Sequence, residues 1–213
     1  MPLLSALVVL LSLLLAGPAV AADADLMLRV QYQYVAFNIP SGSFAAQPRK
    51  LWRIGDSHLR LEEPVNPDNR EQRLVLVAQP DIWIIDQAAK KGTHRKDPGP
   101  TYKTRFPVFP GESAGIVELE MGREVQFFTE KQAAPGPERT VGSVTCHTLS
   151  MEIDGKTLTL YTRSSDGLPY QVVIETEERA LAVRYAEYTP GIPPDLALFK
   201  PAPDVVLQES DGK

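Results

Sequence analysis

The residues best suited to chemistry are few in this chain, and their spacing forms no known catalytic or metal-binding motif. Three histidines, His58, His94 and His147, are scattered through a short hairpin, a loop and a strand of the expected pattern. None of them lies at an HxH, HxxxH or HExxH spacing, which would bring two zinc ligands onto one face of an element. The sequence also lacks a GxSxG motif and glycine-rich phosphate loops. It therefore predicts a protein that is not an enzyme and that uses no cofactor.

The chain has a single cysteine, Cys146, and therefore has no internal disulfide framework. His147 follows it directly, but neighbours in a strand point to opposite faces, so the two cannot form a nucleophile–base pair. A reactive or intermolecular thiol is one interpretation of Cys146. The other, which we favour, is a small buried apolar residue in a strand.

Residues 87–112 are rich in Pro, Gly, Lys and Asp, which predicts a long loop or a mobile flap. This stretch carries a basic cluster made of Lys90, Lys91, His94, Arg95 and Lys96. The cluster could contact an acidic partner or a headgroup, or it could be an ordinary solvated loop tip.

Aromatic residues supply the remaining candidates for a binding site. Trp52 and Trp83 each lie among apolar neighbours in an expected strand. Together with Phe127 and Tyr161, they are the candidates for lining an apolar ligand cavity. Ordinary core packing is the alternative interpretation of the same residues.

The elements that must position these residues are mostly strands. Alternation of apolar and polar residues predicts strands within 26–34, 51–63, 73–86 and 140–189, with hairpin turns at four places. These turns are Gly55-Asp56, Gln79-Pro80-Asp81, Asp154-Gly155 and Asp166-Gly167. A fifth is expected at Glu178-Arg179, before the last long strand.

One segment changes period and predicts a helix. An apolar stripe recurs at helical spacing, with Ser113 as N-cap and three charged residues facing water. The stripe comprises Val117, Met121, Val125 and Phe128, and the charged residues are Glu118, Arg123 and Glu124. A short apolar anchor near the end of the chain is formed by Leu196, Leu198 and Phe199.

The first 21 residues have the features of a secretory signal peptide. An apolar run ends at Gly17-Pro18, and Ala19 and Ala21 fit the −3 and −1 positions of a signal peptidase site. We expect cleavage after Ala21 and a single β-rich domain over 22–213. The signal has no lipidation cysteine, so the mature chain is expected to be soluble in a bacterial-type periplasm. A net charge of −5 argues against nucleic acid as a partner.

The predicted fold class is α+β, with a large antiparallel sheet of about eight strands and one substantial helix. One helix cannot cover such a sheet, so the sheet must curl on itself or leave an apolar hollow.

The order of these elements resembles the LolA/LolB-like family of periplasmic lipoprotein carriers and related outer-membrane lipoprotein-sorting proteins. The passages that carry the resemblance are IWIID with the Lys-rich stretch after it, LEMGREVQFF, GSVTCHTLSMEI with KTLTLYTRSSDGLPYQVVIE, and YTPGIPPDLALFKPAP. The resemblance implies an incomplete, strongly curved antiparallel barrel whose open side is covered by helices. It also implies a hollow for acyl chains and no catalytic residues. Carriers of this family hold their lid closed with an arginine, and the sequence alone matches no position to it.

Three functions follow as hypotheses. The first is a soluble periplasmic binding or carrier protein that holds an apolar ligand, a lipid or a lipoprotein acyl chain, in the hollow of the sheet. The alternative is a non-enzymatic scaffold or regulatory domain that binds another envelope protein through a sheet edge or residues 87–112. The third is a hydrolase built from distant carboxylates, which no recognised spacing supports.

Overall fold

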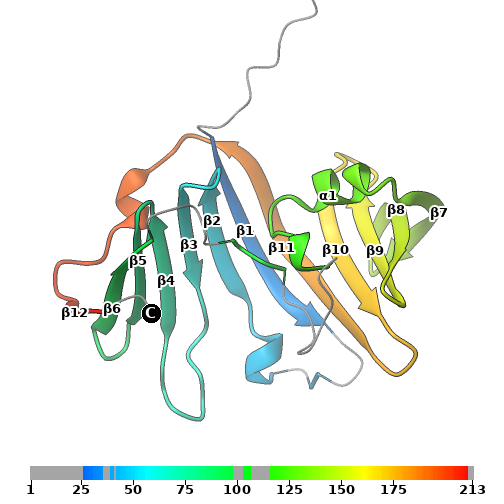
Figure 1. Ribbon diagram of the computed structural model, residues 1–213. Helices are drawn as coiled ribbons and strands as arrows, with labels where there is room; N and C mark the ends of the chain where they lie inside the picture. Colours follow the sequence, from blue (N-terminus) through cyan, green and yellow to red (C-terminus); the bar gives the residue numbers. More distant parts are fainter. Residues whose placement is uncertain (1–25, 36–38, 41, 98–102, 107–115, 211–213) are drawn as a thin grey trace, which may run out of the picture.

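The structure is a computed structural model that describes residues 26–35, 39–40, 42–97, 103–106 and 116–210 (Figure 1). The expected signal peptide and Ser113 lie outside the described residues. The described chain forms one sheet of twelve strands. The strands are β1 (Met27–Val35), β2 (Arg49–Ile54), β3 (His58–Glu62), β4 (Arg73–Ala78), β5 (Asp81–Asp86), β6 (Lys91–Lys96), β7 (Ala134–Val141), β8 (Val144–Ile153), β9 (Lys156–Arg163), β10 (Pro169–Glu175), β11 (Ala180–Ile192) and β12 (Val206–Glu209). One α-helix, α1 (Glu124–Glu130), and the 3-10 turns η1 (Phe44–Ala46), η2 (Ile116–Glu118) and η3 (Leu196–Phe199) complete the described part.

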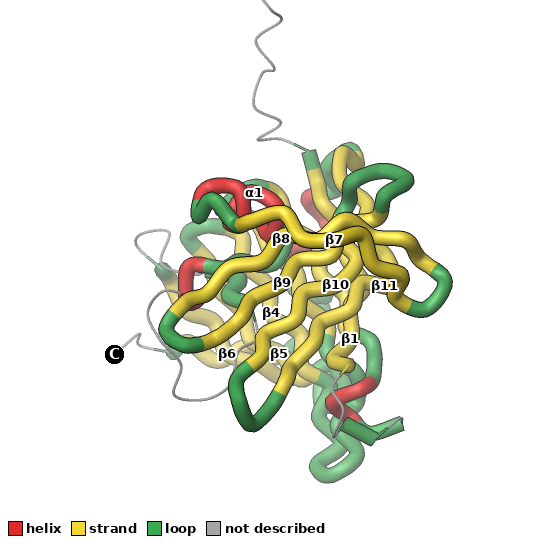
Figure 2. The backbone as a smooth tube through the Cα atoms, turned by 90° about the vertical axis from the view of Figure 1, so that its right-hand side faces the viewer, coloured by secondary structure: helices red, strands yellow, loops and turns green. Residues whose placement is uncertain are grey.

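The sheet is open, with β12 at one end and β7 at the other. Its order is β12-β6-β5-β4-β3-β2-β1-β11-β10-β9-β8-β7, so two antiparallel meanders meet where β1 pairs with β11. Only β12 runs parallel to its neighbour in this described sheet. Seen from the side, β7–β11 stand in front of β4–β6, so the two halves of the sheet form opposite walls (Figure 2). The open sheet agrees with the predicted incomplete barrel, whereas its helical cover in the described residues is a single seven-residue helix.

The turns expected from the sequence are found where predicted. Gly55 joins β2 to β3 with φ +50°, Asp154 and Gly155 join β8 to β9, and Gly167 precedes β10 with φ +72°. Asp154 and the glycines adopt a positive φ, which tight hairpin turns require and which glycine adopts at little cost. Local sequence therefore sets where this sheet reverses.

The prediction of a single long helix between Ser113 and Phe128 is wrong. The described residues form η2, then an irregular stretch through Leu119–Arg123, and then α1. Gly122 causes the interruption, because its φ of +88° is incompatible with a helix. A side chain at position 122 would be strained at this φ, and its Cβ would lie 2.5 Å from Leu28 Cδ2, which would have to shift. After this break α1 has its own register, so Val125 is 40% exposed and Glu124 is buried.

Two stretches that the sequence analysis did not predict as strands, or predicted only in part, are strands at or next to the edges of the sheet. Lys91–Lys96 forms β6, paired with β5, within the expected loop 87–112, of which 98–102 and 107–112 lie outside the described residues. Ala134–Val141 forms β7, whose eight residues include Pro135 and Pro137. Proline is tolerated at a sheet edge because the missing N–H can face away from the ladder. These strands were not predicted because they contain residues typical of loops and lack the alternating apolar residues of a half-buried strand.

The sheet has two covered faces. The inner face, which packs against residues 103–106 and 116–133, carries the main core. Its sheet residues include Val30, Tyr32, Leu51, Leu59, Val77, Ile82, Leu158, Leu160, Val172, Ile174 and Val183. The outer face of β1–β5 is covered by the chain after β11, where buried Phe199 of η3 contacts Met27 and Ile54. The predicted apolar anchor is thus confirmed at Phe199, while Leu196 is exposed.

Within the described residues, no helix is long and apolar enough to span a membrane.

Candidate functional site

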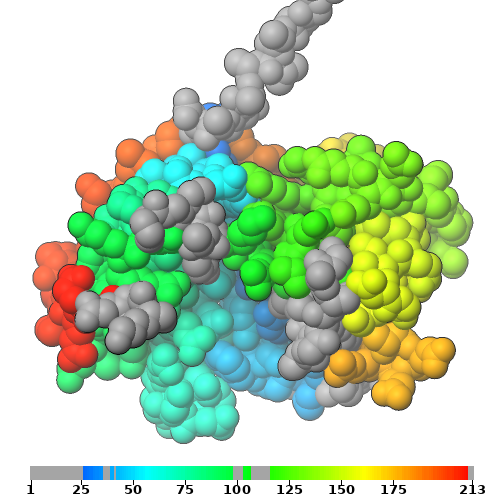
Figure 3. All heavy atoms as spheres, in the orientation of Figure 1, coloured from blue at the N-terminus to red at the C-terminus, as the bar shows by residue number. Residues whose placement is uncertain are grey.

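Described residues 103–106 and 116–133, here called the inner cover, lie across the inner face of the sheet. Figure 3 shows them in green on the front of the molecule, between the two halves of the sheet. Their buried apolar side chains belong to the same cluster as the sheet residues beneath them. These side chains are Phe106, Ile116, Leu119, Met121, Phe127 and Phe128. The hollow of the sheet is therefore filled by the chain's own side chains in this state.

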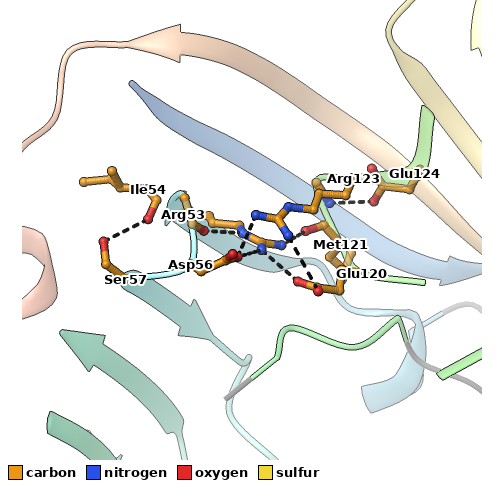
Figure 4. A network of polar contacts seen from close by, with 10 residues as sticks. Arg53, Ile54, Asp56, Ser57, Glu120, Met121, Arg123 and Glu124 are labelled. Atoms are coloured by element: carbon orange, nitrogen blue, oxygen red, sulfur yellow. Dashed lines mark hydrogen bonds and ion pairs between the residues drawn. The ribbon is translucent and has the colours of Figure 1, made fainter. Parts of the chain in front are cut away.

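Arg53 of β2 fastens the inner cover to the sheet (Figure 4). Its guanidinium donates to the Met121 carbonyl oxygen at 2.9 Å and to Glu120 Oε2 at 2.7 Å, both in the inner cover. It also donates to the Gly55 carbonyl at 2.7 Å and to Asp56 Oδ1 at 2.6 Å, both in the hairpin turn after β2. Arg53 is only 6% exposed, so an arginine projects from an apolar face and is satisfied by this one arrangement.

A second arginine completes the network. Arg123 contacts Asp56 Oδ1 at 2.6 Å, and its Nη1 lies 3.8 Å from Glu120 Oε1. Partial burial acts to raise the pKa of Asp56, but hydrogen bonds from Arg123 and Arg53 outweigh it, so this pKa lies below its ordinary value. Two arginines and two carboxylates thus balance their charges between the β2–β3 turn and the inner cover.

Glu124 ties the other side of the inner cover to β11. Its Oε1 accepts from the Tyr185 hydroxyl and, at 2.8 Å, from the Gly122 amide, while Oε2 accepts from the Tyr188 hydroxyl at 3.2 Å. The side chain is fully buried, and this burial raises the pKa of Glu124 above its ordinary value despite the hydrogen bonds from Tyr185, Gly122 and Tyr188. The prediction that Glu124 faces water is therefore wrong.

The inner cover thus packs against the sheet through apolar side chains and is held to it by two sets of polar contacts. Arg53 holds it to β2, and Glu124 holds it to β11 on the far side of β1. The groups are suited to holding a segment in place, since each is already saturated with partners. Among the described residues, no cluster of three His, Cys, Asp or Glu side chains could hold a metal ion.

The predicted cavity residues do not come together. Only Phe127 lies in the inner-face cluster. Trp52 packs near Phe199, Trp83 packs near Val205 and stacks on His94, and Tyr161 alternates with the inward-facing Leu158 and Leu160. Three of the four therefore lie on the outer face, because residues one apart in a strand point to opposite sides. The four predicted residues therefore do not line one common hollow. Whether any of them contacts a ligand stays a prediction.

Cys146 is fully buried, as the favoured interpretation predicted. Burial raises the pKa of its thiol, which keeps it in the less reactive protonated form.

The sequence reasoning missed Arg53 and Glu124, and the local pattern explains why. Arg53 has the same strand parity as Leu51, so it belongs to the inner face, but Trp52 and Ile54 make the opposite parity equally apolar. Glu124 was predicted to face water because the apolar stripe was read as one continuous helix, and Gly122 interrupts that helix. The glycine at position 122, inside the expected helix, was the available signal, since glycine readily adopts the positive φ that ends one helical register before another begins.

Comparison with known proteins gives no match to any protein-family model and none to a curated protein. Similarity is found among solved structures. An uncharacterised conserved protein from Thermus thermophilus has a TM-score of 0.50 at 10% identity, over 88% of this chain and 93% of that chain. The likeness to it is therefore one of fold, along nearly the whole length of both chains.

Two further similar structures have lower scores. The Pseudomonas aeruginosa MucA/MucB complex gives a TM-score of 0.44 at 13% identity, over 85% of this chain and 58% of that chain. A LolA superfamily protein from Nitrosomonas europaea gives 0.33 at 10% identity, over 84% and 91%. The family that the sequence resembles is thus among the solved structures similar to this chain.

Proposed function

We propose that this chain is an exported, non-enzymatic binding protein of the periplasm that carries an apolar ligand, a lipid or a lipoprotein acyl chain, on the inner face of its sheet. The observation that carries the proposal is the inner cover, which fills an apolar hollow yet is fastened by the polar contacts of Arg53 and Glu124. Apolar contacts have no preferred direction, whereas charge-assisted hydrogen bonds form in only one geometry. This combination suits a segment that can leave the sheet and return to the same position.

The energies of opening and of binding are of similar size. Leaving one partner of a buried ion pair such as Arg53–Glu120 unpaired costs about 3–5 kcal/mol, and we take this as the scale of the polar cost of opening. Burial of an acyl chain stabilises the complex by about 0.8 kcal/mol per CH₂, so roughly six methylenes offset that cost. A long acyl chain therefore supplies enough free energy to displace the cover.

Phe127 and Phe128 are the proposed contacts of the bound chain. Both rings belong to the inner-face cluster, and exposing either to water would cost about 1.5–3 kcal/mol. The lifted cover is therefore expected to keep these rings against the ligand as its roof. Leu158 and Leu160 of β9, beneath them in the same cluster, form the corresponding floor.

The placement of the protein in the cell is part of the proposal. Residues 1–21 are taken as a signal peptide cleaved after Ala21, and 22–213 as one domain working in solution. The apolar run, the Gly17-Pro18 break and the small residues before the cleavage site support this.

The alternative function, a scaffold that binds an envelope protein through a sheet edge, ranks second. Of the two outermost strands, β7 contains Pro135 and Pro137, which lack the N–H that an added strand needs. β12 has only four residues. With β12 in place, the two outermost described strands therefore offer little backbone for pairing, whereas the inner face is a large apolar surface.

A fluorescent dansyl fatty acid tests the carrier function on the purified mature chain. The double variant Arg53→Met/Glu120→Gln removes the fastening without leaving a buried charge unpaired. We expect it to bind the probe at least about tenfold more tightly than the wild type, because apparent affinity rises with the open fraction. The matched control is Arg163→Met/Asp166→Asn, which removes a surface pair in the β9–β10 turn and leaves probe affinity unchanged.

Native mass spectrometry of the gently purified wild type supplies an independent readout, as a mass increment for a co-purified lipid. Absence of probe binding in both the wild type and the fastening variant, together with a clean apo mass, would refute the carrier function.

A further inference from the structure

The last described strand is one that the chain adds to the sheet after a long connection. β12 pairs with β6 in parallel, from Val206 opposite Lys91 to Glu209 opposite His94. Backbone hydrogen bonds from Val206 N to the Lys90 oxygen, 3.0 Å, and from Ser210 N to the His94 oxygen, 2.8 Å, bracket the pairing. Residues 200–209, here called the tail, lead from the buried Phe199 to this edge. The tail therefore occupies the edge of β6 that would otherwise be free.

Alternate side chains of the tail fill an apolar recess on the outer face. Val205 and Leu207 pack against a cluster formed by Leu74, Leu76, Ile85 and Trp83. Val206 between them points away and is 63% exposed. This spacing of two gives the recess two positions for apolar side chains, as strand addition requires.

Both acidic groups of the tail meet basic groups beside the recess. Asp204 Oδ2 lies 2.6 Å from Lys90 Nζ. Glu209 Oε1 lies 2.8 Å from His94 Nδ1, while Asp81 Oδ1 lies 2.8 Å from His94 Nε2 on the other side of the ring. Carboxylates at both ring nitrogens favour the imidazolium form of His94, and its ring stacks on Trp83 at 5.3 Å.

The tail is held lightly compared with the chain before it. Phe199 is fully buried, whereas within the tail only Pro201, Val205 and Leu207 are even half-buried. The ion pairs of the tail are solvent-exposed and contribute little to holding it. Segments with few buried contacts open with low free energy, so β12 is suited to exchange.

We propose that the edge of β6, with its apolar recess, is a docking slot for an extended strand of a partner protein, and that the tail is a placeholder in it. The tail then shows what the slot accepts: an acidic residue, two apolar residues at alternate positions, and a second acidic residue. The pattern in this chain is Asp204-Val205-Val206-Leu207-Gln208-Glu209. The partner is thus an acidic, apolar-alternating peptide segment.

Charge complementarity favours this partner over a basic or neutral one. Lys96 has the same strand parity as His94 and so lies on the outer face with it, whereas Lys91 and Arg95 have the opposite parity. The slot therefore carries basic groups at Lys90, His94 and Lys96. The slot lies on the outer face and at the opposite end of the sheet from β7, so it does not depend on the carrier function of the inner face.

The test is a fluorescence-anisotropy titration of a labelled peptide with the sequence of residues 202–210. The receptors are the full mature chain and the same chain with Leu207→Asp and Glu209→Lys, which loosen the tail. We expect the loosened chain to bind the peptide at least about tenfold more tightly, because the slot is no longer occupied. Leu196→Asp changes an exposed leucine outside the slot and should bind the peptide as weakly as the wild type.

Two further arms probe the slot itself. A peptide with lysine at both acidic positions should bind the loosened chain at least about tenfold more weakly, as should the original peptide after His94→Gln in that chain. Hydrogen exchange of the amides in β6 should show loss of protection in the loosened chain and recovery when the peptide is added.

Equal binding of the charge-reversed peptide, or no binding once the tail amides are shown to be released, would overturn the proposal. Persistent protection of β12 in the loosened chain would also overturn it, since the tail is then no placeholder. A dimer by light scattering, formed in place of peptide capture, would overturn the heterologous partner and assign the slot to the tail of a second copy.

Discussion

The inner cover and the tail are attached to the same sheet in different ways. The inner cover is fastened by groups that water barely reaches, with Arg53 6%, Glu120 8% and Glu124 0% exposed. The tail is fastened by groups in solvent, where the side chains of Lys90 and Glu209 are 63% and 79% exposed. Charges interact strongly in the low-dielectric interior and weakly at the surface. Lifting the inner cover therefore costs far more than lifting the tail.

This difference indicates what each segment can do. Under the proposed carrier function, a bound ligand would replace the buried contacts of the inner cover, which would stay closed in the empty protein. The tail can leave and return with little change in free energy, which suits a slot where one strand is exchanged for another. Four measurements can break or sharpen the contrast.

The largest effect is expected from truncating a core side chain of the inner cover. Phe128 is fully buried in the inner-face cluster, so Phe128→Ala should lower the free energy of unfolding by about 3–5 kcal/mol. Leu207 in the tail is half-buried, so Leu207→Ala should lower it by only about 1 kcal/mol. Urea denaturation followed by circular dichroism measures both, and similar losses would contradict the contrast.

The charged fastenings should differ in the same direction. Arg53→Met leaves Glu120 buried with only a long contact to Arg123, and should cost about 3 kcal/mol in unfolding free energy. Lys90→Met removes a solvent-exposed partner of Asp204 and should leave the urea midpoint unchanged. A large shift of the midpoint in the Lys90 variant would show that the tail is held more firmly than its exposure indicates.

Glu124 should make stability depend on pH. Burial raises the pKa of Glu124 in the folded state. The contribution of this carboxyl group to the free energy of unfolding is therefore fully present below the ordinary carboxyl pKa. It is lost as pH rises through the raised pKa, at up to roughly 1.4 kcal/mol per pH unit. Glu124→Gln keeps the acceptor oxygen and removes the charge, so its stability curve should lack this descent. Parallel curves for the two proteins would show that Glu124 does not titrate differently on folding.

The smallest effect is expected at the tail. Hydrogen bonds to Glu209 and then Asp81 raise the pKa of His94, so its hold on the tail is present at low pH and is lost as pH rises through that pKa. Protection factors for the amides of β12 should fall several-fold over this range by hydrogen exchange. In His94→Gln they should be low at every pH in the range, and a pH-dependent fall retained there would assign it to another group.

Much of the fold could be predicted from local sequence. The strands at β1, β4, β5 and β8–β11 follow from alternation, and Gly55, Asp154 and Gly167 mark turns whose conformations are set within a few residues. The resemblance to LolA/LolB-like proteins likewise rested on element order. β6, next to one edge, and β7, at the other, were missed because proline and lysine obscure a strand that has no apolar face.

The candidate site was mostly missed because it depends on which face is the inner one. Trp52 and Leu51 are both apolar and point opposite ways, so alternation could not say which joins the core. Phe127 was placed with the binding site from the sequence, and it is the one predicted residue found at the inner face.

The sequence by itself determined the β-rich class and the positions of most strands and turns, because these depend on neighbours along the chain. Only the tertiary structure decided that Glu124 is buried beneath two tyrosines of β11, 61 and 64 residues away, and that Arg53 meets Glu120 across 67. It also decided that His94 meets Glu209 across 115 residues. Such contacts join segments with no common local pattern, so they exist only once the sheet has brought them together.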